Sequence, residues 1–195
     1  EGDPRCLQGF FQAVKSAFDD EEKSVAAIKA GRGLSWGDRS PCCFCGTDRF
    51  FRPGYAVNLV DHWIPALTGI REKLEAGAKV ADIGCGHGSS TLLMAKAFPN
   101  SHFTGFDFHP PSIDAANAKR EETDLANVSF EVAAAKNFPG TDYAFICIFD
   151  AIHDMGDPAG AAAHIRRALK DDGSFMVVEP LAGDRELAGT GPIQP

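Results

Sequence analysis

The chain has 195 residues, a length that fits one α/β domain with an additional segment. Hydrophobic residues make up 44% of it and charged residues 24%, so it can bury the core of an ordinary globular protein. Its formal net charge of −8 argues against a nucleic-acid partner, which would need a concentrated basic surface. No apolar run approaches the ~20 residues that cross a bilayer, so we expect no membrane segment.

The cysteines form no disulfide framework. Cys85 and Cys147 fall in expected core elements, where reduced thiols behave as small hydrophobic groups, and this favours a reducing, cytoplasmic setting. Cys42, Cys43 and Cys45 follow Ser40-Pro41, a context typical of a loop. We expect incidental thiols and no metal site there, with zinc or redox use as the less favoured alternative.

The first part of the chain differs from the rest in its sequence pattern. Residues 1–60 mix short helical patterns with glycine-rich breaks, and Phe10, Phe11, Val14 and Phe18 recur at helical spacing. We interpret residues 1–60 as a helical and loop arm, residues 61–180 as the core domain and residues 181–195 as an irregular tail. The chain begins with Glu1 rather than Met, so we expect it to be cut upstream.

The regular part begins with a helix. Asp61 is expected to cap it, and Gly77 suits the position just past its end. The apolar residues expected on its buried face are Ile64, Leu67, Ile70 and Leu74.

From residue 79 onward, apolar strand patterns alternate with helical ones. Helices are expected to begin at Ser89-Ser90, at Ser112 and at Asp157-Pro158, with Gly173 marking the end of the last. Alternation of this kind predicts an α/β, Rossmann-like, doubly wound and mostly parallel sheet with right-handed crossovers. The five expected strands are residues 79–83, 103–107, 128–132, 143–149 and 174–179.

The turn after the first strand contains the residues that are expected to bind a ligand. Gly84, Gly86 and Gly88 let the backbone approach a ligand closely, and the following helix offers free amide groups. Asp107 ends the second strand, where an acid can bind both hydroxyls of a ribose. In such sheets ligands bind beyond the carboxyl ends of the strands, so the sequence predicts a nucleoside-binding site.

The spacing of the glycines in the turn distinguishes between the candidate nucleoside ligands. A dinucleotide site reads Gly-x-Gly-x-x-Gly/Ala, whereas here the third glycine comes one residue early, at Gly88, and Asp82 precedes the first glycine by two residues. The string resembles the first motif of class I S-adenosylmethionine-dependent methyltransferases. With the segments at residues 63–67, 105–109, 149–158 and 178–180, it resembles small-molecule methyltransferases that also carry an upstream winged-helix dimerisation domain.

The resemblance implies roles for particular residues. S-adenosyl-L-methionine would be the cofactor, with its methionine part beside the glycine turn and its ribose on Asp107. The implied cofactor-binding residues are Asp82, Gly84, Cys85, Gly86, Gly88, Asp107, Phe108, Ala135, Phe149 and Asp150, with Phe108 against the adenine and Phe149 and Asp150 near the sulfonium.

The chain also departs from this family. Where an acid commonly accepts from the adenine amino group, it has Ala133-Ala134-Ala135, so we expect that bond to be lost or to move to the backbone at Ala135. Most of the winged-helix domain is missing, and residues 181–195 cannot form the expected final strand pair. The fifth strand would then be an exposed edge, covered by a partner or left by an incomplete chain. A homodimer is left open.

Methyl transfer from a sulfonium needs alignment of donor and acceptor and exclusion of water. If the acceptor is a hydroxyl or phenol, a base helps, and His153 after the fourth strand is the best candidate, with Asp154 as its orienter. The alternative is that both residues only organise the turn before Asp157. Glu179, at the end of the fifth strand, is a further candidate at the border of the acceptor pocket.

Three functions are therefore carried forward. The first is methyl transfer to a small-molecule acceptor. The second is a nicotinamide-dependent oxidoreductase, disfavoured by the glycine spacing. The third is S-adenosylmethionine binding without catalysis, in an incomplete methyltransferase.

Overall fold

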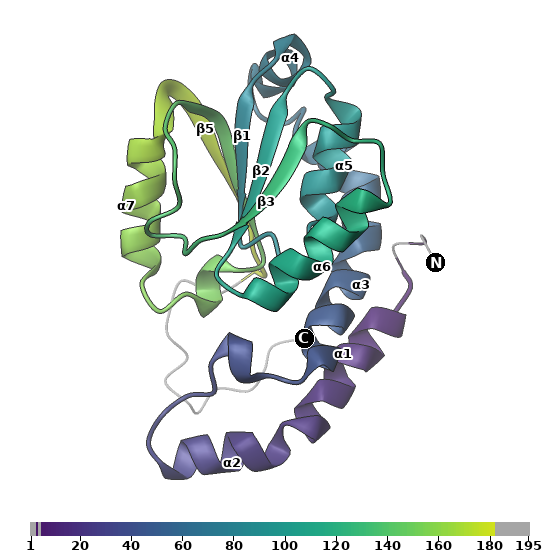
Figure 1. Cartoon of the computed structure of the whole chain (residues 1–195), viewed down its shortest axis with the longest axis vertical. Coiled ribbons are helices and arrows are strands. Elements are labelled where there is room, and N and C mark those ends of the chain that lie inside the picture. Colours follow the sequence, from purple (N-terminus) through teal and green to yellow (C-terminus); the bar gives the residue numbers. More distant parts are fainter. Residues whose placement is uncertain (1–2, 4, 182–195) are drawn as a thin grey trace.

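The computed structural model describes residue 3 and residues 5–181. Its centre is a five-stranded parallel sheet in the order β3-β2-β1-β4-β5 (Figure 1). The chain moves outward from β1 to β3 and returns to β4 on the other side of β1, so the strand order reverses between β1 and β4. The predicted doubly wound α/β fold is confirmed. The strands are β1 (Lys79–Ile83), β2 (His102–Asp107), β3 (Val128–Val132), β4 (Tyr143–Phe149) and β5 (Leu169–Val178).

Helices cover both faces of this sheet. From Phe145 on, alternate residues of β4 point to opposite cores, one shared with α4, α5 and α6 and the other with α7. All seven residues of β4 are buried, as expected of a central parallel strand. The helices are α1 (Gln8–Asp19), α2 (Glu21–Lys29), α3 (Pro41–Asn58), α4 (Ile70–Ala76), α5 (Ser89–Ala97), α6 (Pro110–Glu121) and α7 (Pro158–Ala168), with short turns η1 (Trp36–Asp38), η2 (Leu59–Trp63) and η3 (Ile152–Asp154).

Two expected helix boundaries are wrong. The single helix from Asp61 is instead the π-helical turn η2, a run of turns, and α4, because Pro65 lacks the amide a continuous helix needs and Gly69 adopts a φ of 73°. Gly77 does end α4, as predicted. Helix α6 begins at Pro110 rather than at Ser112, since proline is well suited to a first helical position.

The last strand also differs from its prediction. Helix α7 ends at Ala168 rather than near Gly173, and β5 spans Leu169–Val178 rather than residues 174–179. The reason is a register shift, in which Leu169 pairs with Tyr143 and the next pair is Ser174 with Phe145. Residues 170–173 are therefore an irregular stretch within the strand, which a sequence pattern of regular pleating does not reveal.

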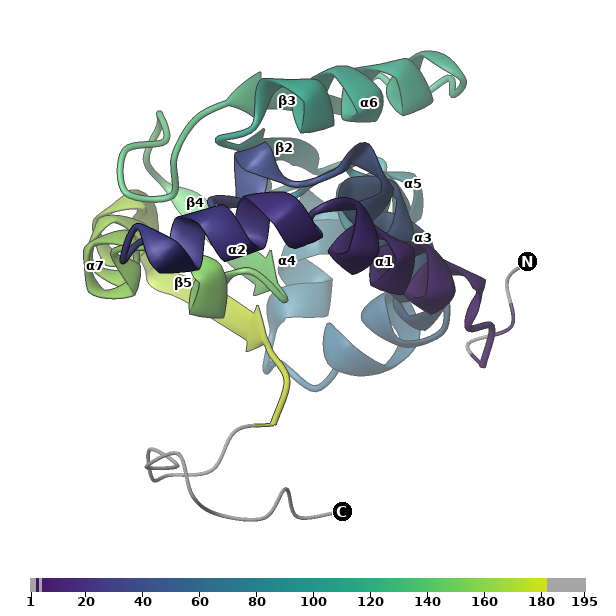
Figure 2. The same ribbon diagram turned by 90° about the horizontal axis from the view of Figure 1, so that it is seen from below.

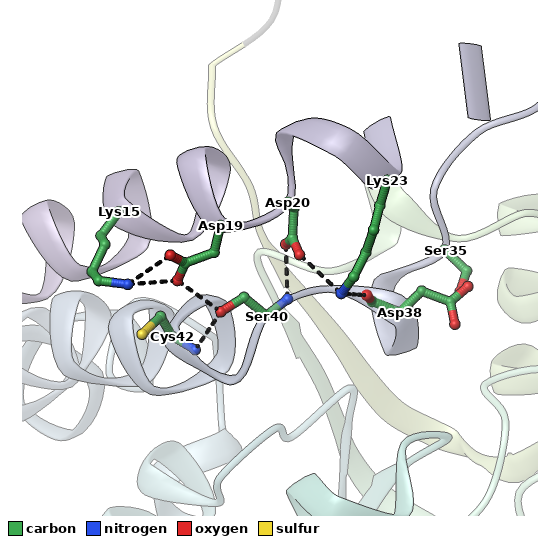
Figure 3. Close-up of polar contacts among 8 residues, drawn as sticks. All are labelled: Lys15, Asp19, Asp20, Lys23, Ser35, Asp38, Ser40 and Cys42. Carbon is green, nitrogen blue, oxygen red and sulfur yellow. Dashed lines mark hydrogen bonds and ion pairs between the residues drawn. The ribbon is translucent and has the colours of Figure 1, made fainter. Parts of the chain in front are cut away.

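The cysteine cluster lies in a helix, not in a loop. Ser40 caps α3, its Oγ accepting a hydrogen bond from the Cys42 amide at 3.3 Å, and Pro41 occupies the first helical position. Asp20 accepts from the Ser40 amide at 2.7 Å and pairs with Lys23, so the polar contacts in Figure 3 fasten α2 to the start of α3. The expectation of a loop was wrong because the Ser-Pro pair is a helix start.

The N-terminal helices lie beneath the carboxyl ends of the strands. Helix α1 crosses α3 where Gly9 and Gly46 meet so closely that a Cβ on either would fall within 2.4 Å of the other helix's backbone. Helix α3 contacts α5 and passes into η2, while α1 and α2 extend below the sheet (Figures 1 and 2). The division at residue 60 stays a prediction, and residues 182–195 of the predicted tail lie outside the described residues. Among the described helices, none is long and apolar enough to cross a membrane.

Candidate active site

The glycine turn between β1 and α5 is fixed by the neighbouring strand. The amides of Gly84 and Cys85 both donate to the Phe106 carbonyl, at 2.7 and 3.1 Å. At Gly88, where φ is 74°, a Cβ would lie 2.5 Å from the Phe130 ring, so this glycine is required for packing. At Gly86 a Cβ would meet nothing within 4 Å, so the backbone there borders open space.

Asp107 connects the second strand to this turn. One carboxylate oxygen accepts from the Gly86 amide at 2.9 Å and the other from the His109 amide, also at 2.9 Å. Each oxygen retains a lone pair after these bonds. Burial raises the pKa of this carboxyl, while the two amide bonds oppose the rise. Asp107 is therefore held rigidly beside the turn, with capacity to accept two further hydrogen bonds.

Asp82 lies behind the turn rather than inside the cavity. It is only 1% exposed, and its Oδ2 accepts from the hydroxyls of Ser90 and Thr91 at 2.6 and 2.7 Å. Its Oδ1 has no hydrogen-bond partner among the residues that the structure describes, and burial raises the pKa of the carboxyl to about 6. Through the two hydroxyls Asp82 positions the first turn of α5.

A cavity of about 620 Å3 opens at the carboxyl ends of β1, β2 and β4. The structure brings together nine of the twelve predicted site residues on its wall, while Asp82, Gly88 and His153 lie outside that wall. Those on the wall are Gly84, Cys85, Gly86, Asp107, Phe108, Ala135, Phe149, Asp150 and Asp154.

The residues that follow β2 and β3 on the cavity wall suit a flat apolar ring. Phe108 is 54% exposed, and the small side chains at residues 133–135 and Lys136 also line the cavity. Residues 133–135 are alanines, at a place where the family that the sequence resembles commonly has an acid.

A group of aromatic rings packs around the end of β4. Phe149 is buried, and its ring lies 5.2 Å from Tyr55 and 6.2 Å from Trp63, centroid to centroid. Burial raises the pKa of Tyr55 well above its ordinary value, so its hydroxyl stays protonated. Asp150 follows directly, with a positive φ of 50°, and burial raises the pKa of its carboxyl as well.

His153 is oriented by Glu179 rather than by Asp154. Its Nδ1 is hydrogen-bonded to Glu179 Oε2, whereas its Nε2 lies 3.8 Å from Asp154 Oδ1. The bond to Glu179 raises the pKa of the imidazole. Glu179 Oε1 in turn accepts from the amides of Ala151 and Ile152, so the carboxylate is fixed by backbone.

One whole wall of the cavity was not predicted from the sequence, and it is formed by α3 and the segment just before it. Asp48 of α3 accepts from the Ser89 hydroxyl and pairs with Lys119 at 2.8 Å, which ties α3 to α5 and α6. The spacing of Phe44, Asp48, Phe51 and Tyr55 along one helix face was a usable signal once Pro41 is taken as a helix start. The N-terminal residues on the wall are Leu34, Ser35, Trp36, Arg39, Phe44, Thr47, Asp48, Phe51 and Tyr55.

Two histidines flank this region. His87 is half-buried on the wall, and burial lowers its pKa. His109 stacks on Phe44 with ring centroids 4.4 Å apart, and its Nδ1 lies 2.9 Å from the Ser112 hydroxyl. His109 therefore joins α3 to the end of β2.

The parallel sheet, the glycine turn and the acid at the end of β2 define a class I methyltransferase fold, the fold of the S-adenosylmethionine-dependent enzymes. The family model described as "Methyltransferase domain" matches residues 74–188, more than half of the chain. The chain belongs to this methyltransferase family.

Named relatives agree with this assignment. The chain is 29% identical to demethylmenaquinone methyltransferase of Lactobacillus johnsonii over 111 residues, covering 55% of this chain and 46% of that protein. It is 30% identical to 27-O-demethylrifamycin SV methyltransferase of Amycolatopsis mediterranei over 118 residues, covering 56% and 43%. The chain thus spans less than half the length of these relatives.

Solved structures show the same fold. The YcgJ protein of Bacillus subtilis is 29% identical, with a TM-score of 0.50 over 54% of this chain and 45% of that chain. An S-adenosyl-L-methionine-dependent methyltransferase described as putative, from Methanococcus maripaludis, has a TM-score of 0.58 at 20% identity, over 69% and 61%. This second likeness concerns the fold alone.

Proposed function

We propose that the chain transfers a methyl group from S-adenosyl-L-methionine to a small-molecule acceptor bound in the 620 Å3 cavity. The observation that carries the proposal is the bond between Asp107 and the Gly86 amide, at the point where the cavity meets the turn. It presents a fixed carboxylate for two ribose hydroxyls beside backbone that a ligand can approach. The strand order also reverses here, where ligands bind in sheets of this kind.

The residues present fit the cofactor. Gly84, Gly86 and Cys85 would border its methionine part, and Asp107, with two free lone pairs, would accept from the ribose. Phe108 would cover the adenine, whose amino group would find a backbone partner near Ala135 in place of the missing acid. Phe149 and Asp150 would lie near the sulfur. Asp82 and Gly88 would act indirectly, by shaping the turn.

The cofactor, when bound, supplies a methyl carbon activated by an adjacent positive charge. The chain's own task is to align the acceptor and exclude water. The aromatic wall of Trp36, Phe44, Phe51 and Tyr55 provides a largely dry surface for this. His153, held by Glu179, would take the proton of a hydroxyl acceptor, with Asp154 beside it on the cavity wall.

We infer an aromatic or quinone-like acceptor. The N-terminal wall is lined with flat rings, which stack well on planar ligands. The relatives' names point the same way: besides the demethylmenaquinone and demethylrifamycin enzymes, a 2-heptyl-1-hydroxyquinolin-4(1H)-one methyltransferase of Mycobacteroides abscessus is 32% identical over 93 residues. We propose a cytoplasmic setting because Cys85 and Cys147 are buried, unpaired thiols.

One observation favours the alternative of binding without catalysis: His153 lies outside the cavity wall. A methylation assay with hydroxylated quinones and quinolones separates the two functions. Transfer that falls in His153→Ala supports catalysis, whereas tight cofactor binding with no transfer to any acceptor supports the alternative.

Calorimetry tests the cofactor itself. Wild-type protein is expected to bind S-adenosylmethionine and S-adenosylhomocysteine but not NAD. Asp107→Asn should weaken binding by ~10–100-fold, since it removes the charge-assisted bonds to the ribose. Asp114→Asn, an exposed change on α6, is the matched control and should bind normally. Absence of binding in the wild type, or equal binding in Asp107→Asn, would contradict the proposal.

A further inference from the structure

Three metal-ligating side chains meet where β4 and β5 end. Asp150 follows β4, His153 lies in η3 and Glu179 follows β5, and one ligand atom from each lies within 4.8 Å of the others. Among residue 3 and residues 5–181, this is the one group of three such side chains. Ligand atoms bound to one ion are ~3 Å apart, so small side-chain rotations would close the group around a cation.

The backbone already holds these groups in place. The Asp150 amide donates to the Val178 carbonyl at 2.8 Å, which joins the two strand ends. Glu179 is fixed through Oε1 by two amides, and this directs its Oε2 toward His153. A carboxylate that is oriented by hydrogen bonds on one oxygen and offers the other is the arrangement that outer-shell contacts give to metal ligands.

The local charge favours a cation. Asp150, Asp154 and Glu179 place three carboxylates around one imidazole, so the group is negative in either protonation state of His153. The imidazole distinguishes it from an acidic surface cluster. One nitrogen and two carboxylate oxygens are a donor set suited to first-row divalent ions such as Mn2+, Co2+ and Zn2+, whereas Mg2+ and Ca2+ prefer oxygen alone.

We propose that Asp150, His153 and Glu179 form a binding site for a divalent transition-metal ion beside the cavity, whose wall Asp150 lines. The ion would replace the hydrogen bond between His153 Nδ1 and Glu179, and the proton of that bond would leave to solvent. Three protein ligands leave positions open, and Asp150 and Asp154 lie on the cavity wall. An acceptor oxygen could bind there and lose its proton to solvent more readily, a role that rests on the proposed function and that would replace proton transfer to His153 while the ion is bound.

Metal binding is tested on the chelator-treated protein, with Mn2+, Co2+, Zn2+ and Mg2+ as separate probes. Calorimetry is expected to give one site per chain, with Mg2+ weakest. Bound Co2+ should show visible absorption bands that report its nitrogen and oxygen ligands. His153→Ala and Glu179→Gln should each weaken binding by ~10–100-fold or more. Glutamine keeps an oxygen for the two amides, so Glu179→Gln preserves the loop.

His102→Ala, which removes an exposed histidine at the start of β2, is the matched control and should bind metal as the wild type does. Circular dichroism checks that all variants fold. No saturable binding, or equal loss in His102→Ala, would overturn the proposal. Cofactor binding is measured separately, by calorimetry on the metal-free protein. If the protein binds metal but not cofactor, the methyltransferase function alone is overturned. If it binds cofactor but not metal, the metal site alone is overturned.

Discussion

At the scale of single residues, the glycines of the turn have different physical tasks. Gly86 borders open space, so its value lies in access to the cavity, whereas Gly88 is packed against the Phe130 ring. The same motif thus combines a binding role with a folding role, and substitution can separate them.

Gly88→Ala is expected to destabilise the fold by ~2–4 kcal/mol, since the new methyl meets an aromatic ring and φ is positive. Gly54→Ala, inside α3 with nothing within 4 Å, is the control and should raise stability by ~0.5–1 kcal/mol. Urea unfolding measures both. An unchanged midpoint in Gly88→Ala would show that Phe130 can move aside at no cost.

Asp82 predicts a pH dependence of stability. Its pKa is raised by burial from 3.8 to about 6, so the folded protein holds this proton more tightly than the unfolded chain. Protonated Asp82 therefore contributes ~3 kcal/mol to the free energy of unfolding. This contribution is complete below the unfolded pKa of 3.8 and is lost as the pH rises through the folded pKa of about 6. Asp82→Asn keeps an acceptor for Ser90 and Thr91 but removes the titration.

We therefore expect Asp82→Asn to become more stable relative to wild type as the pH rises from about 4 to about 6. Unfolding free energies measured across that range give the difference. The exposed Asp114→Asn provides a control that should follow the wild-type profile. Parallel curves for Asp82→Asn and wild type would mean that Asp82 does not titrate in this window.

At the scale of elements, α1 and α2 leave their large apolar side chains exposed, although such a helical face is usually buried. The α1 face on α3 is made of small or polar residues around Gly9 and Ser16, and the large side chains point outward. Their exposed fractions run from 38% for Val14 to 75% for Phe18 and Ile28, and they form an apolar stripe, called the seam here, that runs along the two helices and is interrupted at Asp20 and Glu21. The outward residues on this seam are Leu7, Phe11, Val14, Phe18, Val25 and Ile28.

We expect a second copy of the chain to cover this seam. A symmetric pairing places the same apolar stripe on both partners, so each copy covers the stripe of the other. Sedimentation equilibrium should show a dimer. The double variant Phe11→Ser/Phe18→Ser should weaken association by at least ~100-fold.

Val132→Ser is the control for that experiment, because Val132 is similarly exposed, at 54%, but lies at the end of β3. It should dimerise as the wild type does. A monomeric wild type, or a double variant that dimerises equally, would refute the pairing.

At the scale of the whole molecule, alternation of apolar strands and helices was enough to predict the sheet. Regular strands such as β1, β3 and β4 were predicted with their observed limits, because side-chain period and burial agree there. Elements that break the period were not: β5 contains a register shift, and the helix predicted from Asp61 is interrupted at Pro65 and Gly69. The register shift in β5 leaves no trace in the local pattern, whereas Pro65 and Gly69 are local signals of a break that the apolar periodicity outweighed.

The candidate site was likewise predicted only in part. Residues next to the glycine turn were predicted because the motif fixes them along the sequence. The wall formed by α3 was not, since only tertiary contacts such as Asp48 with Ser89 and Lys119 bring it to the cavity. The pairing of His153 with Glu179 likewise joins two strand ends that are distant in the sequence.

Two separate stretches of the chain build the wall of the cavity. The turn, Asp107 and Phe108 belong to the segment that matches the family model, whereas the aromatic wall comes from residues 34–55, which precede it. A lineage could therefore exchange that early stretch, and with it one wall of the cavity, while the glycine turn and Asp107 stayed unaltered.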